Sequence, residues 1–140
     1  DNPALYVNMA GTYEQEENWN EAIRLNEIAL EKAPDYHKAL VSLGRLHAMF
    51  GRLDQSIPLY ERALELQPDD ALRRSVLGGC YLAADRTEDA RAQFEQAVAL
   101  DPAGDPGKYA AQELTKLGPK PEETGDGDGG EPKKKRWGLW

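Results

Sequence analysis

Apolar and polar positions vary along the first hundred residues with the period of a helix. In each segment the apolar or small side chains recur at i, i+3, i+4 and i+7, as they do at Tyr6, Met9, Ala10 and Tyr13. This spacing places them on one face of an amphipathic helix and leaves the charged residues on the other. The pattern therefore predicts an all-α fold built from short helices.

The ends of these helices are marked by residues with known capping preferences. Asn2 and Pro3 favour a helix start, and this first helix should run to about Glu16. Asn18-Trp19-Asn20-Glu21 is typical of a capping box, in which each outer side chain bonds the other's backbone N–H. The other expected boundaries are a stop at Pro34, a start at Tyr36 or His37, a C-cap at Gly51 and an N-cap at Thr87.

A fixed period, marked by evenly spaced prolines, organises the helices. Pro34, Pro68 and Pro102 each end a similar phrase, and they divide the chain into units 3–36, 37–70 and 71–104. Such a period indicates a solenoid, in which stacked helix pairs bury a continuous core. A further helix at about 106–117 has no partner helix after it, so it should act as the C-terminal cap of a domain spanning residues 1–117.

Stacking the units shows a shared motif. The first halves read Tyr6-x2-Met9-Ala10-x2-Tyr13, Leu40-x2-Leu43-Gly44-x2-His47 and Arg74-x2-Leu77-Gly78-x2-Tyr81; the second halves read Ala22-x3-Asn26-x2-Ala29, Ser56-x3-Tyr60-x2-Ala63 and Ala90-x3-Phe94-x2-Ala97. Residues 3–104 thus resemble the tetratricopeptide repeat family. Asn26, His47 and Arg74 depart from the family pattern, where bulky apolar or aromatic residues are usual.

The resemblance implies a right-handed α-solenoid that binds a protein or peptide partner along a concave groove lined by the first helices. The groove positions carried over to this chain are Val7, Gly11, Lys38, Val41, Arg45, Met49, Leu72, Ser75 and Leu82. Some relatives clamp a chaperone's C-terminal carboxylate with Lys, Asn and Arg. This chain has Val7, Gly11, Ser42, Leu72 and Val76 at those places, so chaperone-tail binding is not expected.

Charge and composition narrow the function classes. The net charge is −8, and residues 1–117 carry all of it because residues 118–140 sum to zero. An acidic body disfavours a nucleic-acid groove, which needs a basic stripe. The mean hydropathy is −0.72, and no apolar run is long enough for a transmembrane helix. The single cysteine, Cys80, should be a buried and inert thiol.

We expect no catalytic site, no cofactor and no metal. His37 and His47 are about 15 Å apart along one helix, and the Asp126–Glu131 segment lacks the ligand set of a calcium loop. The acidic residues around Glu14–Glu21 should form a solvated surface. These features favour a non-enzymatic interaction module; the alternative is the non-catalytic C-terminal region of a larger enzyme or of a secretion or assembly factor.

The C-terminal segment is a second candidate site. Residues 118–132 are rich in Gly, Pro and acidic residues, which is typical of a flexible linker. The motif that follows consists of Lys133, Lys134, Lys135, Arg136, Trp137, Gly138, Leu139 and Trp140. It fits a nuclear-import signal, an anionic membrane surface, a docking motif anchored by Trp, or a solubilising end.

Two expectations concern assembly. Asp1 occupies the place that follows the repeat-ending proline, as Asp35 and Asp69 do, so native repeats should precede it or another chain should cover the first helix. The basic, Trp-containing end should dock on a tetratricopeptide unit, in cis or in trans, or on a similar partner. Both expectations favour an oligomer or a larger complex.

Overall fold

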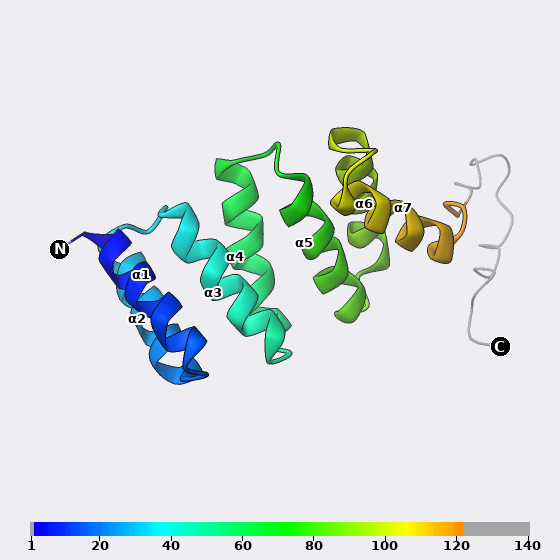
Figure 1. Ribbon diagram of the computed structural model, residues 1–140. Coiled ribbons are helices and arrows are strands. Elements are labelled where there is room, and N and C mark those ends of the chain that lie inside the picture. Colours follow the sequence, from blue (N-terminus) through cyan, green and yellow to red (C-terminus); the bar gives the residue numbers. More distant parts are fainter. Residues whose placement is uncertain (1, 122–140) are drawn as a thin grey trace, which may run out of the picture.

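The computed structural model describes residues 2–121. In that part the chain forms seven helices and no strands: α1 (Pro3–Gln15), α2 (Trp19–Lys32), α3 (His37–Met49), α4 (Leu53–Leu66), α5 (Ala71–Ala83), α6 (Thr87–Leu100) and α7 (Asp105–Leu117). Consecutive helices pair α1 with α2, α3 with α4 and α5 with α6, and the pairs stack in a row (Figure 1). The prediction of an all-α solenoid is confirmed.

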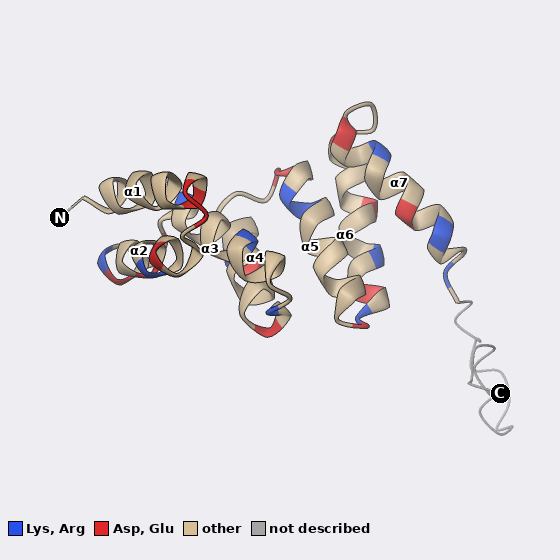
Figure 2. Cartoon of the chain, turned by 60° about the horizontal axis from the view of Figure 1, so that its bottom comes forward, with Lys and Arg blue, Asp and Glu red and all other residues tan. Residues whose placement is uncertain are grey.

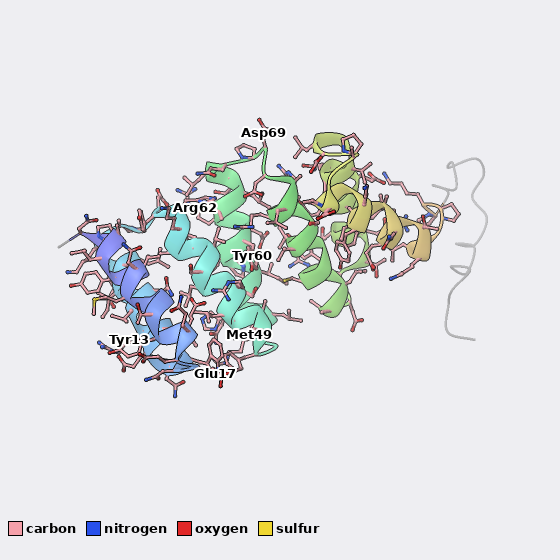
Figure 3. All side chains as sticks on the ribbon, in the orientation of Figure 1. Tyr13, Glu17, Met49, Tyr60, Arg62 and Asp69 are labelled. Atoms are coloured by element: carbon pink, nitrogen blue, oxygen red, sulfur yellow. The ribbon has the colours of Figure 1, made fainter. Side chains whose placement is uncertain are left out.

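Small residues allow the two helices of each pair to pack closely. Ala22, Ser56 and Ala90 occupy equivalent positions on the second helices, and each is 0% exposed. Across the third pair, a Cβ added at Gly78 would lie 2.6 Å from the Phe94 ring. The equivalent distance from Gly44 to the Tyr60 ring is 3.3 Å, and Figure 3 shows Tyr60 in the middle of the array. A small residue therefore faces a large ring within each of these pairs.

The turns inside the repeats share one backbone geometry. Glu17, Gly51 and Asp85 hold the same place in successive repeats, and all three have a positive φ, of 58°, 72° and 59°. The next residue in each repeat is the N-cap of the second helix. The prediction of Thr87 as an N-cap is therefore wrong: Arg86 is the N-cap, and Thr87 is the first residue of α6.

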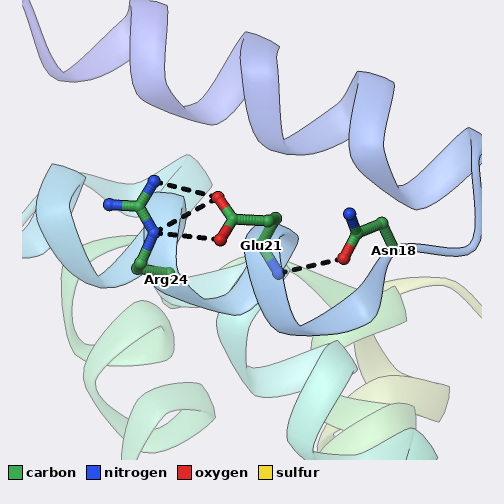
Figure 4. Close-up of polar contacts among 3 residues, drawn as sticks. All are labelled: Asn18, Glu21 and Arg24. Atoms are coloured by element: carbon green, nitrogen blue, oxygen red, sulfur yellow. Dashed lines mark hydrogen bonds and ion pairs between the residues drawn. The ribbon is translucent and has the colours of Figure 1, made fainter.

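The capping interactions of α1 and α2 agree only in part with those predicted from the sequence. The Asn2 side chain accepts a hydrogen bond from the N–H of Ala4, as expected. The Asn18 side chain accepts from the N–H of Glu21, but the Glu21 carboxylate binds Arg24 instead of returning to Asn18 (Figure 4). The capping box is therefore half formed, because a nearby guanidinium takes the carboxylate.

The three departures from the repeat motif are accommodated differently. Asn26 is fully buried, and its amide donates to the carbonyl of Ala22. His47 is also buried. Arg74 turns its guanidinium outward to donate to the Pro68 carbonyl and the Gln93 side chain, so it links α5 to α6 and to the preceding loop.

α7 packs against α5 and α6 at the end of the described array. Ala110 is buried against α5 and α6, and Leu114 and Leu117 are partly buried in the same cluster. At the positions where the other first helices meet their second helix, α7 carries Lys108, Gln112 and Thr115, which are all exposed. These polar side chains present no apolar face to a further helix.

Candidate partner-binding surface

The first helix of each repeat contributes one side of the array, and α7 continues it. We define the first-helix face as the exposed side of α1, α3, α5 and α7. Along this line α1 contacts α3, and α5 contacts α7. α7 begins one full repeat period after α5, so it enters in the register of a fourth first helix. The predicted groove positions all lie on α1, α3 and α5.

A shallow hollow of about 370 Å³ lies where α3, α4, α5 and α7 converge. Small side chains leave this space, since Ala48, Gly79 and Ala83 have little or nothing to fill it. An apolar side chain of a few carbon atoms would fit there. The complete lining is Ala48, Leu53, Ser75, Val76, Gly79, Cys80, Ala83 and Tyr109.

Tyr109 forms the α7 side of this hollow. Its ring packs edge-on against Phe94 at a centroid distance of 5.9 Å, and its hydroxyl lies 3.4 Å from where a Cβ would stand on Gly79. Partial burial, and then the charge of Glu113, raise the pKa of the Tyr109 phenol. The hydroxyl is therefore neutral near pH 7 and can donate a hydrogen bond.

Tyr109 was not among the predicted residues of the binding surface. The repeat period could have identified it: counted by that period, Tyr109 occupies the same position as Val7, Val41 and Ser75 in the three preceding repeats. Leu53 was also missed, because it reaches the hollow from α4 and not from a first helix. Val76 had been considered only as a position of the carboxylate clamp that this chain lacks.

The predicted groove residues do not all offer a free surface. Met49 and Leu72 are 50% and 48% exposed; Val7, Gly11, Val41 and Leu82 are partly exposed. Ser75 lies at the hollow but is buried, and its hydroxyl donates to the Leu72 carbonyl. Ser75 therefore helps to shape the hollow, but its hydroxyl is not available to donate a hydrogen bond to a partner.

The two predicted groove cations differ in availability. The Arg45 guanidinium is paired with Glu14, so it ties α3 to α1. Lys38 is exposed and makes no ion pair with any residue in 2–121. Lys38, Arg45 and Ala48 recur at i, i+7 and i+10, which puts them along one face of α3. Lys38 therefore lies about 15 Å along that helix from the hollow.

Charge is segregated between the two sets of helices. α1, α3 and α5 together hold Lys38, Arg45, Arg73 and Arg74 against Glu14, a net charge of +3. α2, α4 and α6 hold nine acidic and four basic residues, a net charge of −5. The expectation of a uniformly acidic body is therefore wrong, although the overall charge is −8. Figure 2 colours the charged residues along each helix.

The chain leaves α7 along the second-helix side. Buried Arg91 of α6 donates to the Gly118 carbonyl at 2.7 Å, and Lys120 lies 3.5 Å from Glu95, one turn further along α6. These contacts direct residues 118–121 over α6. The predicted tail site, residues 133–140, lies outside the described residues.

The remaining groups considered for chemistry can also be located in residues 2–121. No cluster of three or more His, Cys, Asp or Glu side chains in this range could hold a metal. Cys80 is buried, and its burial raises the pKa of the thiol. None of the helices in this range combines the length and the hydrophobicity that crossing a bilayer requires.

Comparison with known proteins shows which chains this one resembles. The chain is 29% identical over 114 residues to anaphase-promoting complex subunit 7 of Dictyostelium discoideum. It is 33% identical over 82 residues to the protein CTR9 homolog of Arabidopsis thaliana. These matches cover 80% and 58% of this chain, but only 20% and 8% of the relatives. The chain therefore spans a fifth or less of their length.

Solved structures share the fold. The first tetratricopeptide domain of Spaghetti (RPAP3), bound to the HSP90 peptide SRMEEVD, superposes with a TM-score of 0.73 at 16% identity, over 82% of this chain and 89% of that one. An O-GlcNAc transferase of Thermobaculum terrenum gives 0.64 at 26% identity, over 72% and 19%. The family pattern of the tetratricopeptide repeat matches residues 1–69 and 35–103. The chain is a member of the tetratricopeptide repeat family, whose repeats generally mediate protein–protein interaction.

Proposed function

We propose that this chain is a non-enzymatic interaction module that holds a segment of a partner protein along its first-helix face. The hollow beside Tyr109 is the observation that carries this proposal, because it is an apolar recess on the exposed side of the array. An apolar side chain of the partner fills the recess, in the manner of an anchored peptide. The phenol of Tyr109 can hydrogen-bond the partner's backbone.

The charge of the first-helix face adds a preference for the partner's sequence. Lys38 is exposed and can bind a carboxylate, and it lies about 15 Å along α3 from the hollow. An extended peptide spans that distance with about four to five residues. The preferred segment therefore carries an apolar anchor and an acidic residue with roughly that separation.

Selection from a random peptide display library on the immobilised chain tests this proposal. Enriched peptides should share the anchor and the acidic residue, and they should lose affinity for Gly79→Leu, which fills the hollow. Gln96→Leu is the matched control, because it adds the same side chain on the exposed side of α6. Peptides that bind Gly79→Leu and the parent chain equally would overturn the proposed site.

The C-terminal residues 133–140 form a second anchor within an assembly. Their four cations do not suit the first helices, whose net charge is +3, and they are complementary to the second helices, whose net charge is −5. Residues 118–121 already run over α6 toward that side. The tail therefore docks on a second-helix surface, in cis or on a neighbouring repeat protein.

A second candidate function is the interaction region of a larger enzyme. The observation that favours it is the similarity to the O-GlcNAc transferase, of which the chain covers 19% at 26% identity. In that case this chain would present substrates to a catalytic domain elsewhere. Sequencing the transcript that encodes the chain distinguishes the two candidate functions. The second one requires a catalytic domain in the same gene product.

A further inference from the structure

One position of the repeat carries an arginine in the third unit and isoleucine in the first two. Ile23, Ile57 and Arg91 each follow the start of their own unit by the same number of residues. Ile57 is 5% exposed and belongs to the apolar cluster that α4 to α7 share. Arg91 on α6 is equally buried, at 5% exposed. A buried charge therefore stands where the preceding repeats place an apolar side chain.

The Arg91 guanidinium makes few polar contacts for a buried charge. Its Nη1 donates a hydrogen bond to the Gly118 carbonyl at 2.7 Å. Its Nε lies 3.5 Å from the carboxylate of Glu88, which is largely exposed, and makes no hydrogen bond within residues 2–121. An apolar side chain of similar volume in such a place is often neutral or stabilising, because it avoids the cost of taking the charge out of water. Stability alone therefore does not account for arginine at this position.

Gly118 presents its carbonyl to Arg91 through a backbone conformation that favours glycine. It is the C-cap of α7, with φ 74° and ψ −172°, a combination that is essentially restricted to glycine. No atom lies within 4 Å of a Cβ added there, so the backbone conformation, and not crowding, is what requires glycine. Two residues far apart in the sequence, one on α6 and one at the end of α7, are thus both suited to a single contact.

This contact sets the direction in which the chain leaves α7. Glu95 lies one turn after Arg91 on α6, and its carboxylate is 3.5 Å from the Nζ of Lys120. Residues 118–120 therefore cross α6 from one contact to the other. Both side chains of the Lys120 pair are exposed, and exposed ion pairs contribute little. The buried contact of Arg91 is therefore the firmer of the two.

We propose that Arg91 is a positioning residue, which holds Gly118 against α6 and so starts the C-terminal segment on the acidic second-helix side of the array. The consequence for residues 133–140 rests on the docking proposed above. A segment that starts on α6 is closer to the acidic residues of that helix than one that continues along the axis of α7. Holding Gly118 in place therefore raises the effective concentration of the basic end at the second helices.

A spin label at residue 121 tests the contact independently of docking. The label is attached to Pro121→Cys, since Pro121 is exposed and Cys80 is buried, in the full chain with Trp137→Ala and Trp140→Ala. Its EPR spectrum should show restricted motion, and Arg91→Ile should convert most of it to the spectrum of a freely moving label. The melting temperature of Arg91→Ile should be unchanged or higher, because isoleucine is the residue of the other repeats. A label that stays equally restricted in Arg91→Ile overturns the proposal.

A second variant reaches the same contact from its other partner. Gly118→Ala should also release the label, because alanine disfavours the backbone conformation that aims this carbonyl at Arg91. Arg74→Ile is the matched control: Arg74 also donates to a backbone carbonyl, that of Pro68, but from α5, so the label should remain restricted. Equal release by Arg74→Ile and Arg91→Ile would show a general loosening of the fold and would contradict a specific role for Arg91.

Fluorescence quenching measures the consequence for the tail. In a Trp19→Phe background with the tail intact, the protection of Trp137 and Trp140 from an aqueous quencher should fall by about twofold or more in Arg91→Ile. A released label together with unchanged protection would show that Arg91 does not position the tail, and the proposal fails. If the tryptophans are unprotected even with Arg91 in place, the docking proposed above is wrong, while the spin label still decides whether Arg91 holds Gly118.

Discussion

Gly78 stands where the helices of the third repeat come closest. A Cβ there would lie 2.6 Å from a carbon of the Phe94 ring, which is closer than real side chains come. Gly78→Leu should therefore lower the free energy of unfolding by about 1–3 kcal/mol through overpacking. Urea denaturation of the variant and the parent chain measures this difference.

Gly11 provides the matched control for Gly78. It lies on the first helix of its repeat, one position later in the period, and no atom lies within 4 Å of its added Cβ. Gly11→Leu should leave stability unchanged or raise it by up to about 1 kcal/mol, because Leu favours the helix more than Gly does. If Gly11→Leu and Gly78→Leu lowered the free energy of unfolding equally, close helix packing would not be the reason for a glycine at position 78.

His47 should make stability depend on pH. Burial, and then the charge of Arg52, lower the pKa of His47 in the folded chain from the ordinary value of 6.5. The unfolded chain therefore binds the proton more readily, so stability is fully present above pH 6.5 and falls as the pH drops from there toward the lowered folded value. Denaturation midpoints between pH 8 and 5 should show the decline.

A tyrosine variant isolates this effect from other titrations. Tyr13 and Tyr81 occupy the equivalent position in the other repeats, so His47→Tyr restores the common residue and removes the titrating imidazole. The decline below pH 6.5 should be smaller in His47→Tyr than in the parent. Identical slopes in both chains would show that other groups cause it.

At the scale of the helix, α4 continues through a proline. Pro58 lies within α4 and is exposed, and it cannot donate a hydrogen bond to the carbonyl of Asp54. Pro58→Ala should therefore raise the free energy of unfolding by about 1–3 kcal/mol, measured by thermal unfolding. Pro68→Ala is the comparison: Pro68 lies in a turn, where its removal frees the unfolded chain and should bring no gain.

Most helices could be predicted from the sequence, because the period marked by the prolines repeats the same boundary three times. The observed ends of α1, α3 and α7 fall within a residue of the expected ones. The start of α6 differed because Asp85, with its positive φ, completes the turn and leaves Arg86 as the N-cap. The partner of the Glu21 carboxylate also differed from the expected Asn18 N–H, because Arg24 competes for that carboxylate. Such choices between nearby side-chain partners depend on geometry that a motif does not specify.

The binding surface was less predictable than the fold. Family positions identified Lys38 and Arg45, but only the structure shows that Arg45 is paired with Glu14 while Lys38 is exposed. The hollow depends on how α7 packs against α5, a contact between elements that the whole of α6 separates in the chain. Its shape follows from the small side chains of Gly79 and Ala83 together with the position of Tyr109.

At the scale of the whole molecule, net charge was a poor guide to local charge. The first helices carry +3 and the second helices −5 within a chain of −8. The four exposed or partly exposed cations of α3 and α5 do not form a free basic stripe, because Arg45 and Arg74 are held by groups of this chain. Nucleic-acid binding is thus disfavoured by the way these cations are used and not by the total charge.

The last prediction is that residues 133–140 dock on the acidic second helices. Fifteen residues lie between Pro121, the last described residue, and Trp137. A segment of that length with the statistics of a flexible coil would have an r.m.s. span of roughly 20–23 Å, which would allow the basic end to reach α6 and α4 of its own or a neighbouring chain. Tethering raises its effective concentration to about the mM level, and a weak site would fill.

Replacing the two tryptophans tests this docking. In a Trp19→Phe background, the emission of Trp137 and Trp140 should be protected from an aqueous quencher, and reversing Glu88, Asp89 and Glu95 to Lys should remove that protection. Trp137→Ala with Trp140→Ala should loosen the assembly. Lys38→Glu, on the opposite side of the array, is the control and should have no such effect. Salt should weaken docking only in part, because the tryptophan contribution is apolar. If residues 133–140 exchange their amide protons as fast as an unstructured peptide, both alone and in any complex, the tail does not dock.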